Sequence, residues 1–162
     1  MFQIGDKVVY PMHGAGIIEA IEEKEILGEK QQYYILRLPM GGMKVMIPVK
    51  NVDEIGIREV ISPDKVDSVV EVLSSSESKM PANWNKRYRL NMDRIKSGDI
   101  YQVAAVVRNL MFRDREKGLS TAERKMLNSA RQILISELAL SKDMDEEEVI
   151  ELVDKASKGE SV

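Results

Sequence analysis

Apolar residues in the first 60 positions form short runs separated by turn residues, which is typical of β-structure. Pro11 closes the first run, and the Gly41-Gly42 pair supplies the positive backbone angles of a tight turn. Strands are expected over 7–10, 15–26, 32–38 and 44–48, with a turn at 27–30. Short strands joined by glycine-containing turns predict a small barrel or a strongly bent sheet. An edge strand of such a sheet can pair with a strand of a partner.

The period changes after Ser62-Pro63, where a serine before a proline favours a helix start. From there on, apolar residues recur at i, i+3, i+4 and i+7, the pattern of amphipathic helices. Helices are expected to begin near residues 63, 84, 100, 121 and 145. Asn83 is the expected cap of the second helix, Ser97-Gly98-Asp99 opens the third, and Ser120 with Glu123 forms a capping box for the fourth.

These two patterns predict an α+β chain in which residues 1–60 form a β domain and residues 61–162 a compact helical domain. At 162 residues, each would be a small domain near the lower limit for a stable core. A serine-rich polar break at 74–82 interrupts the helical part. The sequence leaves open whether this break is a flexible linker or a loop inside the second domain.

Charge is distributed unevenly along the chain. The net charge is -3, but residues 86–131 hold 12 Lys and Arg against 5 Asp and Glu, a local charge of +7. A local positive field matters more to a polyanion than the global average does. Solvated helix faces would account for most single charges, whereas the block as a whole favours nucleic-acid binding.

Candidate catalytic chemistry is sparse. The chain has no cysteine and a single histidine, His13 in an expected turn, so a transition-metal site is not expected. The serines lie at helix caps and in the polar break, without an adjacent base. We therefore expect no catalytic residue, no cofactor and no metal. The first residues lack the basic stretch and long apolar run of a signal peptide, and no apolar run is long enough to cross a bilayer, so we expect a cytoplasmic protein.

The sole tryptophan, Trp84, lies at an expected helix start with Lys86, Arg87 and Arg89 close behind it. On a helix, Lys86 and Arg89 share one side, while Trp84 and Tyr88 stack on another. One interpretation is that Trp84 packs into the core. The other is that an exposed ring wedges into a base step of the minor groove while the cations hold phosphates.

A second basic cluster brackets the glycine turn at residue 118. Arg113 and Arg115 precede this turn, and Arg124 and Lys125 follow the capping box. Cations near a helix C-terminus are also stabilised by the helix dipole. Amides at the start of the next helix can bind phosphate. We expect both clusters to contribute to DNA binding.

Taken together, these features resemble the CarD/CdnL family of bacterial RNA polymerase-binding regulators. The resemblance covers nearly the whole chain, and the order and spacing of its motifs make it specific. The matching segments are Val8-Val9-Tyr10-Pro11 with His13-Gly14, Asn83-Trp84 with Arg87-Tyr88, Gly98-Asp99, Val106-Val107-Arg108-Asn109-Leu110, Gly118-Leu119-Ser120, Met126-Leu127 and Ala130-Arg131-Gln132-Ile133-Leu134.

The resemblance implies a Tudor-like (SH3-like) β domain that binds the polymerase β subunit through a strand edge. It also implies a helical domain on promoter DNA, where Trp84 wedges into the minor groove and stabilises the open complex. Lys24 and Ile26 match positions of β-subunit contact. Where well-known relatives carry an arginine, this chain has Met46, with Lys44 on the same strand face. A monomer located on the nucleoid is expected.

Two other functions remain open at this stage. The same β domain type occurs in transcription-repair coupling proteins, so the chain could be an adaptor that recruits another factor to polymerase. The third hypothesis is a general DNA-compacting protein, which would bind DNA equally well without polymerase. The role of Trp84 among its neighbouring cations discriminates between these functions.

Overall fold

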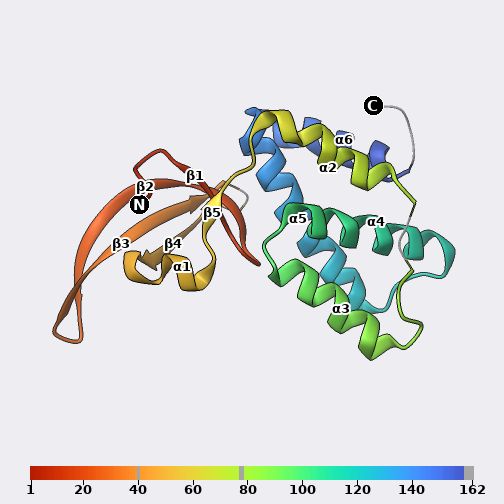
Figure 1. The fold of residues 1–162 in the computed structure, drawn as a ribbon, viewed down its shortest axis with the longest axis horizontal. Coiled ribbons are helices and arrows are strands. Elements are labelled where there is room, and N and C mark those ends of the chain that lie inside the picture. The colour runs from red at the N-terminus through yellow and green to blue at the C-terminus, as the bar shows by residue number, and fades with distance from the viewer. Residues whose placement is uncertain (40, 77–78, 159–162) are drawn as a thin grey trace.

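The computed structural model describes residues 1–39, 41–76 and 79–158, as a curved β-sheet followed by a group of helices (Figure 1). The strands are β1 (Lys7–Tyr10), β2 (Gly14–Ile26), β3 (Glu29–Leu38), β4 (Met43–Pro48) and β5 (Arg58–Glu59). The helices are α1 (Val52–Ile55), α2 (Val66–Ser74), α3 (Trp84–Lys96), α4 (Ile100–Glu116), α5 (Thr121–Lys142) and α6 (Glu146–Ser157), with short 3-10 turns at Val49–Asn51 and Pro63–Lys65. The expected α+β class is confirmed.

The five strands form one antiparallel sheet in the order β4-β3-β2-β1-β5. Of the two forms expected, the described strands make the bent sheet, with β4 and β5 at its edges. Strands β2 and β3 continue past the end of β4 as a projecting hairpin arm. Its turn is tighter than expected: Leu27 and Gly28, both at positive φ (53° and 80°), join the paired residues Ile26 and Glu29.

One face of the sheet carries the smaller of two hydrophobic cores, which includes Val8, Ile18, Tyr34, Leu36 and Ile47. Side chains alternate across a strand, so the neighbouring positions lie on the outer face. A β-bulge between Ile18 and Ala20 shifts the register of β2, so that Ile21, three residues after Ile18, faces the same core.

The larger core lies among the helices and includes residues of α2 as well as of α3 to α6. Val66, Val69 and Leu73 of α2 are almost completely buried in it. The polar break at 74–82 therefore joins two helices of the same body, which favours a loop over a flexible linker. Arg108 reaches this loop and donates to the carbonyl of Val72 and the hydroxyl of Ser75. Residues 77–78 of the break, and 159–162 at the chain end, lie outside the described residues.

Helix starts follow the expected caps in the second half of the chain. Side chains of Asn83, Asp99 and Ser120 accept hydrogen bonds from first-turn amides of α3, α4 and α5. Ser62 differs, because Pro63–Lys65 first makes a 3-10 turn before α2 begins at Val66. None of the described helices is both long and apolar enough to span a bilayer.

Candidate nucleic-acid interface

Trp84 is the first residue of α3, which places its ring at the end of the helix. The Asn83 side chain caps this helix by accepting a hydrogen bond of 3.0 Å from the amide of Lys86. The cap satisfies a free amide of the first turn and so fixes where the helix begins. Local sequence therefore makes Trp84 the first residue of the helix, and the contacts of its ring decide where the indole lies.

Two contacts then hold the indole ring. Its plane stacks on Tyr88, with ring centroids 5.1 Å apart and an interplanar angle of 19°. Its Nε1 donates a hydrogen bond of 3.1 Å to the hydroxyl of Ser120, the cap of α5. Trp84 nevertheless stays 40% exposed. The stack on Tyr88 is confirmed, and the ring is anchored at the surface rather than packed in the core.

Arg87 requires a correction to the expected set of phosphate contacts. It is only 2% exposed, and its guanidinium pairs with the Glu123 carboxylate at 2.8 and 3.2 Å. It also donates to the carbonyls of Pro81 and Ala82. A buried, fully engaged guanidinium is not available to a phosphate. Arg87 lies on the inward side of α3 with Asn91 and Ile95, and it ties α3 to α5.

Glu123 connects the buried ion pair to the anchor of the indole. Burial raises the pKa of its carboxyl, but hydrogen bonds and charge from Arg87, a hydrogen bond from Ser120 and the charge of Arg113 together leave this pKa below its ordinary value. Ser120 caps the Glu123 amide at 3.2 Å and donates to its carboxylate at the same distance. The first turn of α5 thus holds Trp84 and Arg87 together.

Lys86 and Arg89 are exposed on α3, on the side turned away from the buried Arg87. Within the described ranges, no ion pair ties either of them to an acid. Both positive charges therefore face solvent close to the exposed indole.

The second basic cluster divides in the structure. Lys125 is exposed and lines a groove of about 250 Å³ with Tyr88 and Met92, beside the indole stack. Arg124 is exposed but pairs with Asp114 at 2.7 Å, and this carboxylate raises the pKa of its guanidinium.

The side chains of Arg113 and Arg115 both interact with other groups of the chain. Arg113 is half-buried, and its charge acts on Glu123. Arg115 is exposed, but its Nη2 donates to the carbonyl of Ser157 at the end of α6. Arg113 therefore lies near Glu123 in the group around Trp84, whereas Arg115 is held toward the end of α6.

Residues expected to face the polymerase lie along the edge and outer face of the sheet. Register pairs Met46 with Ile35 and Lys44 with Arg37, opposite to the core-facing positions. Met46 is 42% exposed on the edge strand β4, and Lys44 pairs with Glu19 at 2.7 Å.

Lys24 and Ile26 share this outer face but lie farther out, on the hairpin arm. Lys24 is four residues beyond Ala20, which pairs with Ile35 in the row of Met46. This spacing corresponds to roughly 13 Å along the strand. The four expected residues thus form two groups on one face of the sheet, both of them exposed.

His13 is exposed in the turn between β1 and β2. Its ring lies edge-on to Tyr10, with centroids 4.5 Å apart. Among the described residues, no group of three or more His, Cys, Asp or Glu side chains is placed to hold a metal ion.

Sequence reasoning missed Ser120 as the anchor of the indole and Glu123 as the partner of Arg87. A signal was present for Glu123, because it lies three and four residues before Met126 and Leu127 on the apolar stripe of α5. A carboxylate on a buried stripe requires a buried cation as its partner. Nothing local indicated that this cation would be Arg87.

Both parts of the chain match known protein families. Residues 2–61 match the family model described as the CarD-like/TRCF RID domain, and residues 68–154 match the CarD C-terminal domain. The chain is 48% identical, over 149 residues, to the putative transcription factor YdeB of Bacillus subtilis (strain 168), covering 92% of this chain and 97% of that protein.

Two solved structures are also similar in sequence. One is the solution structure of the 72-residue N-terminal domain of Myxococcus xanthus CarD, 37% identical, covering 36% of this chain and 79% of that one, with a TM-score of 0.33. The other is CdnLNt from Myxococcus xanthus, 45% identical, covering 38% of this chain and 87% of that one, with a TM-score of 0.34.

Proposed function

The chain belongs to the CarD/CdnL family and is a CarD-like transcription factor, and from this premise we propose that it docks on the RNA polymerase β subunit and stabilises the open promoter complex. In this proposal, residues 1–60 bind polymerase and residues 61–162 bind DNA. The protein acts as a monomer in the cytoplasm, on the nucleoid. It needs no cofactor and performs no catalysis, because binding energy alone does the work.

The exposed, anchored indole of Trp84 is the observation that carries the proposal. An apolar ring held rigidly at the surface can enter a base step of the minor groove, most easily where the duplex is already distorted. A ring that binds the melted, kinked state more tightly than the closed duplex shifts the equilibrium toward the melted state. The upstream edge of the transcription bubble offers such a distorted step.

Phosphate contacts would come from the exposed cations around this ring. Lys86, Arg89 and Lys125 face solvent, and Arg124 can exchange Asp114 for a phosphate. Such contacts fix position without reading sequence. Arg87 instead pairs with Glu123, which in turn is hydrogen-bonded to Ser120, the residue that holds the indole of Trp84.

On the polymerase side, the proposal rests on the β4 edge and the outer face of the sheet. An exposed edge strand can add to a sheet of the partner through backbone hydrogen bonds. Met46 and Lys44 would flank this contact, with Lys24 and Ile26 contributing from the arm. Because the apolar side chain of Met46 is exposed on this edge, we expect a contact that is more apolar than charged.

The test separates the two binding surfaces in the full-length chain. Met46→Asp should abolish co-purification with core polymerase while leaving the fold intact, since the side chain is exposed. Trp84→Ala should co-purify normally but shorten the lifetime of promoter complexes challenged with heparin. Loss of a stacking ring is worth about 1–3 kcal/mol, or roughly a fivefold to 150-fold shorter lifetime. An intact chain that does not bind polymerase would remove the proposal.

The adaptor function is the second candidate, because the N-terminal family model is described for both CarD-like proteins and TRCF. An adaptor would lose its activity with Met46→Asp but not with Trp84→Ala. A general DNA-binding protein would instead bind DNA equally well without polymerase. The two variants, together with a DNA-binding measurement without polymerase, therefore distinguish all three functions.

A further inference from the structure

Helix α5 contacts both the sheet and the tryptophan-bearing helix. It packs against β1 and β2 as well as against α2, α3, α4 and α6. Its 22 residues span about 33 Å at 1.5 Å per residue. Its first turn holds Trp84 through Ser120 and Arg87 through Glu123.

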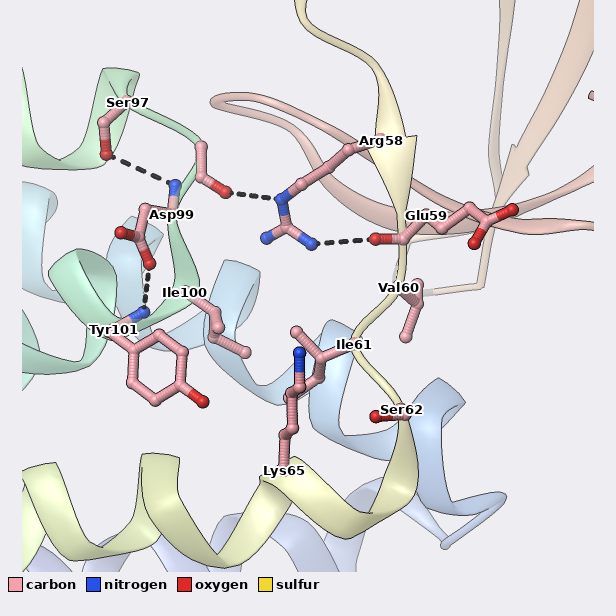
Figure 2. A pocket seen from close by; sticks show the side chains of 11 residues that line it. Arg58, Glu59, Val60, Ile61, Ser62, Lys65, Ser97, Asp99, Ile100 and Tyr101 are labelled. Carbon is pink, nitrogen blue, oxygen red and sulfur yellow. Dashed lines mark hydrogen bonds between the residues drawn. The ribbon is translucent and has the colours of Figure 1, made fainter. Parts of the chain in front are cut away.

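The last third of α5 presents a strip of buried polar groups to the sheet. Glu137 is the centre of this strip and is 2% exposed. Its carboxylate accepts hydrogen bonds of 2.7 Å from both terminal nitrogens of Arg58 on β5. It also accepts one of 2.9 Å from the amide of Ile61. Arg58 in turn donates from Nε to the carbonyl of Gly98 in the turn between α3 and α4 (Figure 2).

Three further contacts continue along the same helix face. The Ser136 hydroxyl accepts a hydrogen bond of 2.9 Å from the amide of Ala15. The Ser141 hydroxyl donates to the carbonyl of Ile61 at 2.7 Å, and the carbonyl of Leu140 accepts one of 2.8 Å from Lys7. Positions 136, 137, 140 and 141 lie on one side of a helix, so the contacts act together.

Such an interface fixes orientation more sharply than an apolar one. Two apolar surfaces can shift slightly against each other at little cost. A buried carboxylate that accepts three directed hydrogen bonds loses all three when the surfaces shift. Gly14 reinforces this, because a Cβ at that position would lie 2.8 Å from the Ser136 hydroxyl. The sheet is therefore held against α5 at close range and in one orientation.

We infer that α5 sets the position of Trp84 relative to the polymerase-binding sheet, with Glu137 as the positioning residue of this link. The inference rests on the proposed function. Docking of the sheet then presents the indole at one place on the promoter, at a high effective concentration. Loosening the link would leave both binding surfaces intact but spread the indole over a larger volume.

Glu137→Gln tests the link, because it keeps the shape of the side chain and removes its charge. Asp154→Asn is the matched control, since it removes the 2.6 Å ion pair of Arg131 on α5, which stays within the helical part. The chain has no cysteine, so spin labels can be placed at Glu25→Cys on the arm and Lys96→Cys on α3. Electron-electron distance measurement then reports the sheet-to-helix geometry.

We expect one narrow distance distribution for the parent protein and for Asp154→Asn, and a broadened one for Glu137→Gln. Open-complex lifetime should fall about threefold or more in Glu137→Gln alone, as the effective concentration drops. Binding to core polymerase should stay unchanged in all three proteins. If Glu137→Gln fails to fold, Ser141→Ala and Arg58→Lys weaken the same link more mildly and are read in the same way.

A narrow distribution in the folded variants would overturn the inference, as would a broad one with an unchanged lifetime. Failure of the proposed function looks different. In that case the parent protein itself does not prolong open complexes, while the distance measurement still reports whether the buried strip fixes the sheet on α5.

Discussion

The indole Nε1 of Trp84 donates a hydrogen bond to the same Ser120 hydroxyl that caps helix α5. A residue 36 positions away thus both starts one helix and steadies a ring on another. The carboxylate of Glu123 joins these two roles to the buried Arg87. The exposed indole proposed to contact DNA is therefore held in place by hydrogen bonds that lead to a buried ion pair.

Removal of this hydroxyl has two separable effects. Ser120→Ala should lower the free energy of unfolding by about 1 kcal/mol, the usual cost of losing a helix cap. It should also free the indole, which red-shifts the emission of the sole tryptophan. Asp99→Ala removes the comparable cap of α4 and is the control. A similar emission shift in Asp99→Ala would contradict the role of Ser120 as anchor.

The buried pair of Arg87 and Glu123 should dominate the stability of this region. Arg87→Met leaves an unpaired carboxylate in a site that is 2% exposed, and we expect a loss of about 3 kcal/mol in urea denaturation. Arg124→Met breaks an exposed pair with Asp114 and should change stability far less. Equal losses in the two variants would contradict the burial of Arg87 in solution.

Acid should weaken the protein through Glu123. The folded-state pKa of its carboxyl lies below the ordinary value of 4.5, so its contribution to stability is present above pH 4.5. That contribution is lost as the pH falls from 4.5 through the lower, folded-state value. The unfolding free energy of Glu123→Gln should therefore approach that of the parent protein on acidification. Asp64, whose pKa is lowered chiefly by a hydrogen bond from Ser62, remains in both proteins. A stability difference that stays constant across this range would refute the prediction.

Salt dependence should identify the phosphate contacts. Lys86→Ala, Arg89→Ala and Lys125→Ala should each lower the slope of log affinity against log salt by about 1 in polymerase-bound promoter complexes. Lys96→Ala removes an exposed cation at the far end of α3 and is the control. If all four substitutions change the slope alike, the positive block acts only as a diffuse field.

The two turn glycines Gly14 and Gly28 should respond differently to alanine. Both have positive φ, 103° and 80°, so each Ala variant should lose about 1–2 kcal/mol through backbone strain. Gly14→Ala should lose roughly 1–3 kcal/mol more, because its Cβ meets the Ser136 hydroxyl, whereas nothing lies within 4 Å at Gly28. Thermal or urea unfolding measures both, and equal losses would mean that the sheet can move away from α5.

Local interactions account for what could be predicted from the sequence. Alternation of apolar residues and turn glycines indicated the strands, and the caps at Asn83, Asp99 and Ser120 indicated the helix starts. Each of these features depends on groups within a few residues of one another, so its physics is complete in a short segment. The stack of Trp84 on Tyr88 belongs to the same class, because positions i and i+4 are neighbours on any helix.

Only the tertiary structure decided which charges are free. Arg87 and Lys86 are adjacent in sequence and chemically alike, yet one is buried against Glu123 and the other faces solvent. The ion pair of Glu137 was likewise decided by the tertiary structure, because its partner Arg58 is 79 residues away. The sequence determined that this chain has a basic helical part with one tryptophan. The packing of α5 determined where that tryptophan lies and which cations remain available, because ion pairing depends on distances that only the folded chain sets.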